Sequence, residues 1–96
     1  MIIDFRSQTT QDIYDGVASK QARKIPITIW KVAQRKLDMI NAAVTLNDLK
    51  VPPGNRLEPL KDDLKGFYSI RINDQYRIIF LFKDGNAYEV EITDYH

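Results

Sequence analysis

Apolar residues recur every three or four positions between residues 29 and 44, and this period predicts an amphipathic helix. Its apolar stripe consists of Ile29, Val32, Ala33, Leu37, Ile40 and Val44. Pro26 suits the first turn of such a helix, where a missing backbone N–H costs no hydrogen bond. The stripe is wide enough to bury one side of the helix against a hydrophobic core.

The residues before this helix predict a short strand followed by a shorter helix. Residues 2–5 are largely apolar and form the expected strand. Ser7, Thr9 and Thr10 are candidate N-caps, because their hydroxyl groups can accept a hydrogen bond from the first backbone N–H groups of a helix. The helix that follows is expected to include Val17.

The last third of the chain changes to a period of two, which predicts three strands. Their apolar positions are Tyr68, Ile70 and Ile72, then Tyr76, Ile78, Phe80 and Phe82, then Tyr88, Val90 and Ile92. Residues 73–75 and 84–86 form the expected turns, and residues 56–66 an expected loop anchored by Leu57 and Leu60. The order of elements predicts an α+β fold, with N-terminal helices packed on a twisted antiparallel sheet of about four strands, the first strand being added to the other three.

Length and composition restrict the classes of protein that fit this pattern. The 96 residues predict one domain, spanning 1–96, and 14 basic against 13 acidic residues leave a net charge of +1. The chain has no cysteine, which excludes disulfides and thiolate metal sites. No apolar run reaches the roughly 18 residues of a membrane span, and the start lacks the features of a signal peptide. A cytoplasmic protein without membrane contact is therefore expected.

The pairing of the first two strands of this group brings two arginines together. If the apolar residues share the helix-covered face, Ile70 pairs with Ile78, and Arg71 lies opposite Arg77 on the other face. Opposed like charges cost stability, and a polyanionic ligand between them would turn that cost into binding. The alternative is a purely structural one, in which Glu91, diagonal to Arg77, forms a surface salt bridge worth under about 1 kcal/mol.

The next hairpin brings the end of the chain to the same place. Pairing Phe82 with Tyr88 keeps the apolar residues on one face and sets Thr93 beside Arg77. Tyr95 then falls near the same end of the sheet. A strand that carries Asp-Tyr-His at its end would therefore finish where the arginines gather.

Several other residues are candidates for chemistry, and each has an ordinary structural explanation. Glu58 and Lys61 lie in the predicted loop, where most acids and bases are simply solvated. His96 is the only histidine, and a terminal histidine is usually part of a frayed end. Residues 20–36 carry six cations and no acid; this stretch either follows phosphates or keeps a helix soluble, and the second explanation is favoured.

The chain has no glycine-rich phosphate loop, no cluster of metal ligands and no Ser-His-Asp arrangement. No metal or cofactor is expected. Metal-independent cleavage of RNA needs less: a base for the 2′-hydroxyl, cations for the phosphorane and a proton for the leaving 5′-oxygen. The arginines and Lys61 can supply the charge. Proton transfer or positioning falls to Glu58 and to residues 94–96.

Three segments of the chain resemble HigB-type toxins of the RelE superfamily, which belong to type II toxin–antitoxin systems. They are Pro-Pro-Gly-Asn-Arg-Leu at 52–57, Ser-Ile-Arg-Ile-Asn-Asp-Gln-Tyr-Arg at 69–77 and Val-Glu-Ile-Thr-Asp-Tyr-His at 90–96. The resemblance covers the whole chain, although its N-terminal third matches loosely. It implies a RelE-like fold with the active site on the concave face of the sheet.

The resemblance also implies an activity, namely cleavage of mRNA in the ribosomal A site. It assigns catalytic or substrate-contact roles to Arg71, Arg77, Asp94, Tyr95 and His96. It extends with less support to Lys61, and Arg56 and Asn73 within the matching segments are further candidate substrate contacts. Some relatives have a histidine where this chain has Glu58, so the general base is expected to be either Glu58 or His96.

The implied partners are the ribosome, its mRNA and a helix-turn-helix antitoxin of the HigA type. Such an antitoxin binds the operator, so DNA would be reached only through it. Two other functions remain open. One is an RNA- or ribosome-binding module without catalysis, which would leave RNA intact. The other is a member of the superfamily directed at DNA gyrase, which would arrest replication instead of translation.

Overall fold

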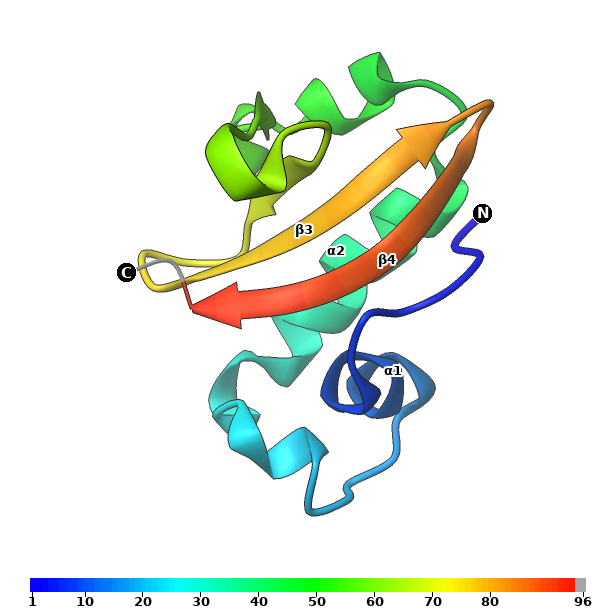
Figure 1. Ribbon diagram of the computed structural model, residues 1–96. Helices are drawn as coiled ribbons and strands as arrows, with labels where there is room; N and C mark the ends of the chain where they lie inside the picture. The colour runs from blue at the N-terminus through cyan, green and yellow to red at the C-terminus, as the bar shows by residue number, and fades with distance from the viewer. Residues whose placement is uncertain (95–96) are drawn as a thin grey trace.

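The structure, a computed structural model, describes residues 1–94 and has two α-helices on one face of an antiparallel sheet in that range (Figure 1). Tyr95 and His96 lie outside the described residues. The elements are α1 (Gln8–Asp15), η1 (Ala22–Lys24), η2 (Ile27–Ile29), α2 (Trp30–Ala42), η3 (Leu46–Lys50), η4 (Pro53–Asn55), β1 (Glu58–Pro59), η5 (Asp62–Leu64), β2 (Tyr68–Arg71), β3 (Tyr76–Lys83) and β4 (Asn86–Asp94), where η marks a short 3-10 helix.

The strands pair in the order β1-β2-β3-β4, and every neighbouring pair is antiparallel. The expected α+β architecture is therefore confirmed. Its fourth strand is not the one expected, because β1 lies in the segment that was predicted to be a loop. A two-residue strand carries no alternation that a pattern could reveal, and its Pro59 is tolerated because β1 is an edge strand.

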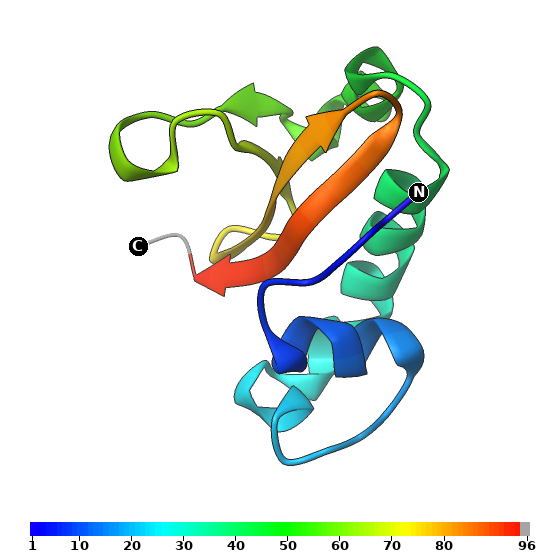
Figure 2. The ribbon, with the colours of Figure 1, turned by 45° about the vertical axis from the view of Figure 1, so that its right-hand side comes forward.

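The hydrophobic core lies between the helices and one face of the sheet. In Figure 2 both α-helices lie on the same side of the β3–β4 pair, while the other side of this pair faces away from them. Ala33, Leu37 and Ile40 of α2 are completely buried, as the helical period predicted. Val44, the last residue of the predicted stripe, is instead 72% exposed, because the helix ends at Ala42. No helix within residues 1–94 is long and apolar enough to cross a membrane.

Helix α1 is bounded by two local signals. The Ser7 side chain accepts a hydrogen bond from the backbone N–H of Thr10, which confirms Ser7 as the N-cap. Gly16 adopts a left-handed conformation with φ 75° and ends the helix. The expectation that Val17 belongs to this helix is therefore wrong, because the left-handed Gly16 has already ended the helix.

A β-bulge changes the predicted pairing of β3 with β4. Ile79 faces Glu91, but two positions further along β3 Leu81 faces Tyr88, so β4 has one extra residue in between. Phe82 consequently pairs with Ala87 and not with Tyr88. The bulge lies at Glu89, whose φ is 50°. A period of two cannot anticipate it, because the extra residue reverses the alternation.

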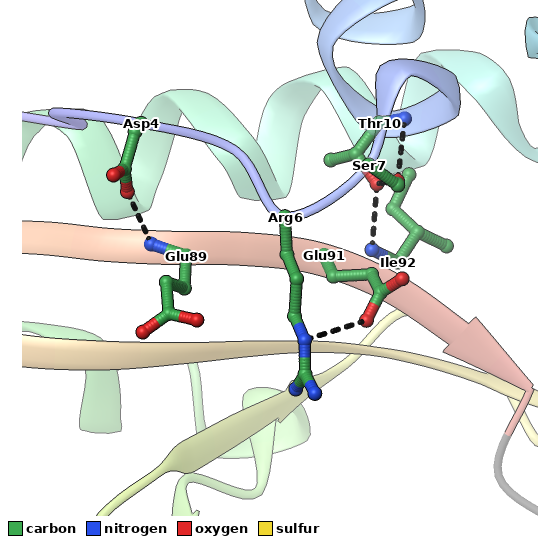
Figure 3. Close-up of polar contacts among 7 residues, drawn as sticks. All are labelled: Asp4, Arg6, Ser7, Thr10, Glu89, Glu91 and Ile92. Atoms are coloured by element: carbon green, nitrogen blue, oxygen red, sulfur yellow. Dashed lines mark hydrogen bonds and ion pairs between the residues drawn. The ribbon is translucent and has the colours of Figure 1, made fainter.

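The N-terminal segment lies beside β4, as expected, but only as isolated parallel bridges at Ile2 and Phe5 and not as a regular strand. Figure 3 shows how side chains from this region satisfy the edge of β4. The Asp4 carboxylate accepts the N–H of Glu89 at 2.5 Å, and the Thr10 hydroxyl accepts the N–H of Ile92 at 2.9 Å. The bulged edge therefore leaves neither donor unpaired.

Candidate active site on the open face of the sheet

Arg77 is a buried charged residue on the face of the sheet opposite the α-helices. It is only 8% exposed. One of its guanidinium nitrogens, Nη1, donates a hydrogen bond to Ser69 Oγ at 2.8 Å and lies 3.1 Å from Glu58 Oε1. The register explains this arrangement, because Glu58 lies opposite Ser69 and both therefore point to the same face as Arg77. The result is a fixed cation beside a carboxylate.

The position of Glu58 depends on a polar anchor between α2 and the segment before β1. Lys36 Nζ donates to Asn55 Oδ1 at 2.5 Å, and the Asn55 amide donates to the carbonyl of Leu49. Both side chains are buried, and burial lowers the pKa of Lys36. Of the six cations between residues 20 and 36, Lys36 therefore neither follows phosphates nor solubilises a helix; it positions the chain that leads into β1.

Arg71 lies directly opposite Arg77 and Arg77 opposite Thr93, as the sequence predicted. The guanidinium groups are nevertheless directed to different partners. Arg71 Nε donates to the carbonyl of Asn73 at 3.2 Å, and its Nη2 contacts the Asp74 carboxylate. The opposition of like charges is therefore relieved by a separate carboxylate for each arginine, and the alternative pairing of Arg77 with Glu91 is replaced by pairing with Glu58.

Asn73 and Asp94 both stabilise the end of the sheet at which the arginines lie. Asn73 Oδ1 accepts the N–H groups of Gln75 and Tyr76, so this oxygen holds the turn between β2 and β3. Asp94 faces Tyr76 and therefore shares the helix-covered side, where its carboxylate accepts a hydrogen bond from the Gln75 amide at 3.0 Å. The structure does not bring Asp94 to the Arg77 side of the sheet. The predicted roles of Tyr95 and His96 concern residues outside the described range.

Lys61 and Glu58 line one hollow beside the Glu58–Arg77 ion pair. Its volume is about 340 Å³, and it is lined by Glu58, Pro59, Leu60, Lys61, Asp62 and Leu64. All of these residues come from one short segment, so the hollow is the inside of a curved loop next to the Glu58–Arg77 pair. Arg56 is exposed and adopts a left-handed conformation at the end of η4.

Sequence reasoning missed Ser69, which is completely buried and accepts the Arg77 hydrogen bond. The signal was present, because Ser69 alternates with Arg71 on the same strand and therefore shares its face. It also missed Arg6 and Phe67, whose side chains meet on this face, with the Arg6 guanidinium carbon 5.4 Å from the centre of the ring. No local pattern could have paired residues so far apart in the chain.

This face combines an oriented cation with a partly exposed carboxylate. A buried guanidinium that is already oriented needs little reorganisation when negative charge develops in a transition state. Glu58, 43% exposed at its side chain, can be reached by a substrate. Among residues 1–94, His, Cys, Asp and Glu form no group of three that could hold a metal ion. The Arg77 guanidinium and the Glu58 carboxylate are groups that can stabilise an anion and transfer a proton.

Comparison with known proteins agrees with this reading of the fold. A family profile described as the RelE-like toxin HigB of type II toxin–antitoxin systems matches residues 3–96. Toxin HigB-1 of Vibrio cholerae is 42% identical over 87 residues, which cover 91% of this chain and 90% of that protein. A protein of Proteus vulgaris named endoribonuclease HigB is 44% identical over 41 residues, which cover 43% of this chain and 45% of that protein.

Solved structures share the fold at low sequence identity. A heterotetrameric YoeB–YefM toxin–antitoxin complex from Staphylococcus aureus contains a chain with a TM-score of 0.60 and 22% identity, covering 100% of this chain and 95% of that one. YafQ of Escherichia coli has a TM-score of 0.59 and 18% identity, covering 99% and 92%. The expected RelE-like fold is confirmed. The chain belongs to the HigB family of RelE-like toxins of type II toxin–antitoxin systems.

Proposed function

We propose that this protein is an mRNA endonuclease that cleaves mRNA in the A site of the ribosome and so stops translation. The observation that carries the proposal is Arg77, a buried arginine held by Ser69 and Glu58 on the open face of the sheet. Membership of the HigB family supports a toxin. The name of the Proteus vulgaris relative supports an endoribonuclease.

In the proposed reaction a base removes the proton of a 2′-hydroxyl, and the resulting oxygen attacks the adjacent phosphorus. The bond from phosphorus to the 5′-oxygen then breaks. The products are a 2′,3′-cyclic phosphate and a 5′-hydroxyl, with the leaving oxygen taking up a proton. Arg77 and Arg71 donate to the phosphate oxygens as charge builds up on the phosphorane. Binding of RNA would exchange the Arg71–Asp74 contact for a contact to phosphate.

The remaining candidate residues take acid–base and positioning roles in this proposal. Glu58 or His96 is the general base, and Tyr95 contacts the substrate. Lys61, next to Glu58 in the same hollow, adds positive charge, while Arg56 and Asn73 are outer contacts to the RNA. Asp94 is a positioning residue, because its bond to Gln75 ties the end of β4 to the turn beside Arg71.

We further propose that a helix-turn-helix antitoxin of the HigA type binds this protein and that DNA is reached only through that antitoxin. The solved relatives from Staphylococcus aureus are toxin–antitoxin complexes, which supports a partner of this general kind. Co-expression with a helix-turn-helix protein encoded next to it tests the pairing. A stable complex that restores translation is expected, and failure to form one would remove this partner.

The experiment that tests the activity is a translation reaction with purified components and one defined mRNA, followed by mapping of new 5′ ends. The wild type is compared with Arg77→Ala and with a chain lacking His96, and a reaction without ribosomes is included. Arg23→Ala is the matched control, because Arg23 is exposed in η1, which packs against α1. Loss of one preorganised donor to the transition state typically lowers the rate by about 10² to 10³.

Cuts at A-site codons are expected only with ribosomes, at full level with Arg23→Ala and at least about 100-fold less with Arg77→Ala. Intact mRNA and normal translation with folded wild type would refute the proposal. Stalled translation with intact mRNA would instead support the binding module without catalysis. Arrest of replication with normal translation would support action on DNA gyrase.

A further inference from the structure

Arg6 reaches the open face from the far side of β4. Its backbone N–H donates to the carbonyl of Val90 at 2.9 Å, which holds the chain beside the strand. The preceding Phe5 packs against the core and its ring contacts Tyr14, so Arg6 points to the opposite side. Figure 3 shows its side chain running from the N-terminal segment across β4, next to Glu91.

Two contacts orient the Arg6 guanidinium on this face. Its central carbon lies 5.4 Å from the centre of the Phe67 ring, which is within the range of a cation–π interaction. Its Nε lies 3.9 Å from Glu91 Oε1, an ion pair too long to be a hydrogen bond. The group is therefore held by an aromatic face and a nearby charge, and neither contact uses its N–H donors.

The hydrogen-bonding state of Arg6 differs from that of the other arginines on the face. Arg71 donates to Asn73 and Asp74, and Arg77 donates to Ser69. Within residues 1–94, the side chain of Arg6 has no hydrogen-bond partner, although only 43% of it is exposed to solvent. A guanidinium whose position is fixed, but whose N–H groups make no hydrogen bonds, can donate two parallel hydrogen bonds to a phosphate group.

The position of Arg6 relative to Arg77 follows from β2 and the residue before it. Arg6 lies over Phe67, and Arg77 is bonded to Ser69, two residues further along the same chain. Leu60 N donates to the carbonyl of Phe67, so the extended pairing of β1 with β2 continues to this residue. Phe67 and Ser69, the residues that the two arginines contact, are therefore about 7 Å apart along the extended backbone. This spacing is on the scale of neighbouring phosphates in a single strand.

We propose that Arg6, supported by the ring of Phe67, forms a second phosphate-binding site for single-stranded RNA next to the site at Arg77. The substrate chain would cross the sheet from β2 toward β4, with the reacting phosphate at Arg77 and an adjacent phosphate at Arg6. Glu91 keeps the Arg6 side chain turned toward the sheet without occupying its donors. The inference rests on the proposed function for the RNA substrate and adds a residue of the N-terminal segment to its binding.

The test is equilibrium binding of a twelve-nucleotide RNA in which every 2′-hydroxyl is methylated, so that it cannot be cut. Fluorescence anisotropy measures the dissociation constant of the full chain over a series of salt concentrations. The variants are Arg6→Gln and Phe67→Leu, with Arg23→Gln as the matched control for loss of an exposed arginine elsewhere. Thermal unfolding of each variant confirms that the protein is folded.

Arg6→Gln is expected to weaken binding about tenfold, since one charge-assisted contact is lost, and to reduce the slope of log K against log salt by about 0.7. Phe67→Leu retains the charge, so a smaller loss of affinity is expected with the slope nearly unchanged. Arg23→Gln should match the wild type. Equal losses for Arg6→Gln and Arg23→Gln, or wild-type binding by either Arg6→Gln or Phe67→Leu, would overturn the site.

Binding and cleavage separate this inference from the proposed function. RNA binding that depends on Arg6 without any ribosome-dependent cuts would leave the phosphate site in place and refute the endonuclease. Ribosome-dependent cleavage by the wild type, together with unchanged RNA affinity and salt slope in Arg6→Gln, would support the endonuclease and refute the phosphate site at Arg6. A wild type that binds no RNA at low salt would refute the second phosphate site outright.

Discussion

The two faces of the sheet in this toxin are built from alternating residues of the same strands but follow different rules. The helix-covered face is apolar, and its central residues Ile70, Ile78 and Phe80 are completely buried. The open face carries charged side chains in pairs, with Glu58 at Arg77 and Glu91 at Arg6. The first face contributes mainly stability, because apolar burial is roughly proportional to area. The second face holds its charged side chains in defined positions through ion pairs.

The two faces differ in how much their side chains contribute to the free energy of folding. On the covered face a side chain can be replaced only at the cost of a cavity. On the open face the Arg6–Glu91 pair is partly exposed, and such pairs contribute little to folding. The Glu58 side chain of the other pair is also partly exposed, although its partner Arg77 is buried.

Removing the largest fully buried side chain should show how much the covered face contributes to stability. Phe80→Ala is expected to lower the free energy of unfolding by about 3–5 kcal/mol, since Phe80 is completely buried between sheet and helices. Urea unfolding followed by circular dichroism measures the change. A loss below about 1 kcal/mol would mean that the core collapses around the cavity, which would contradict the division between the faces.

A change on the edge strand of the open face should lower activity strongly and stability only slightly. Glu58→Gln is expected to lower the cleavage rate by about 100-fold if Glu58 is the general base. It should cost less than about 1 kcal/mol of stability, because its side chain is 43% exposed. Single-turnover cleavage on programmed ribosomes and urea unfolding measure the two quantities. Full activity would transfer the role of base to His96, whereas unfolding would show that this face is structural.

The buried pair behind the site is predicted to behave as part of the covered face. Lys36→Met leaves Asn55 Oδ1 buried without its donor, and a loss of about 1–3 kcal/mol is expected. Burial lowers the pKa of Lys36 in the folded state below 10.5, so the unfolded chain binds its proton more tightly there. The wild type should therefore gain stability relative to Lys36→Met as pH rises from the lowered pKa toward 10.5.

Urea unfolding of both proteins at several pH values measures this difference. The difference in stability between the two proteins isolates Lys36, because the other lysines and the tyrosines titrate equally in both. A gap that shrinks with rising pH would contradict the assignment of Lys36 as a buried, partly desolvated base.

A change at the bulge in β4 should have the smallest effect, and it should raise stability where the other changes lower it. Glu89 has a φ of 50°, which costs a residue with a Cβ about 1 kcal/mol. Glu89→Gly is expected to raise the free energy of unfolding by up to that amount, although the freer unfolded chain offsets part of the gain. Glu89→Ala removes the same side chain but keeps the Cβ, so no gain is expected. Thermal unfolding distinguishes the two, and equal stability of both variants would contradict the strain.

Local patterns were sufficient to predict the elements that bury an apolar face. The helical period located α2, the alternation located β2, β3 and most of β4, and parity alone placed Arg71 opposite Arg77. These features follow from the fixed geometry of helix and strand, so they can be read from neighbouring residues. The same reasoning failed at Tyr88, because one bulged residue reverses every face beyond it.

The partners of the charged residues were decided only by the tertiary structure. The pairing of β1 with β2 brings Glu58 to Arg77, and the passage of the N-terminal segment along β4 brings Arg6 to Phe67. Such contacts join residues far apart in the chain, and a side chain's charge does not specify which opposite charge it will meet. Local periodicity was enough to predict which face of the sheet would be buried and which residue types the open face would carry. Long-range packing determined their geometry, because burial depends on local period whereas contact depends on the path of the whole chain.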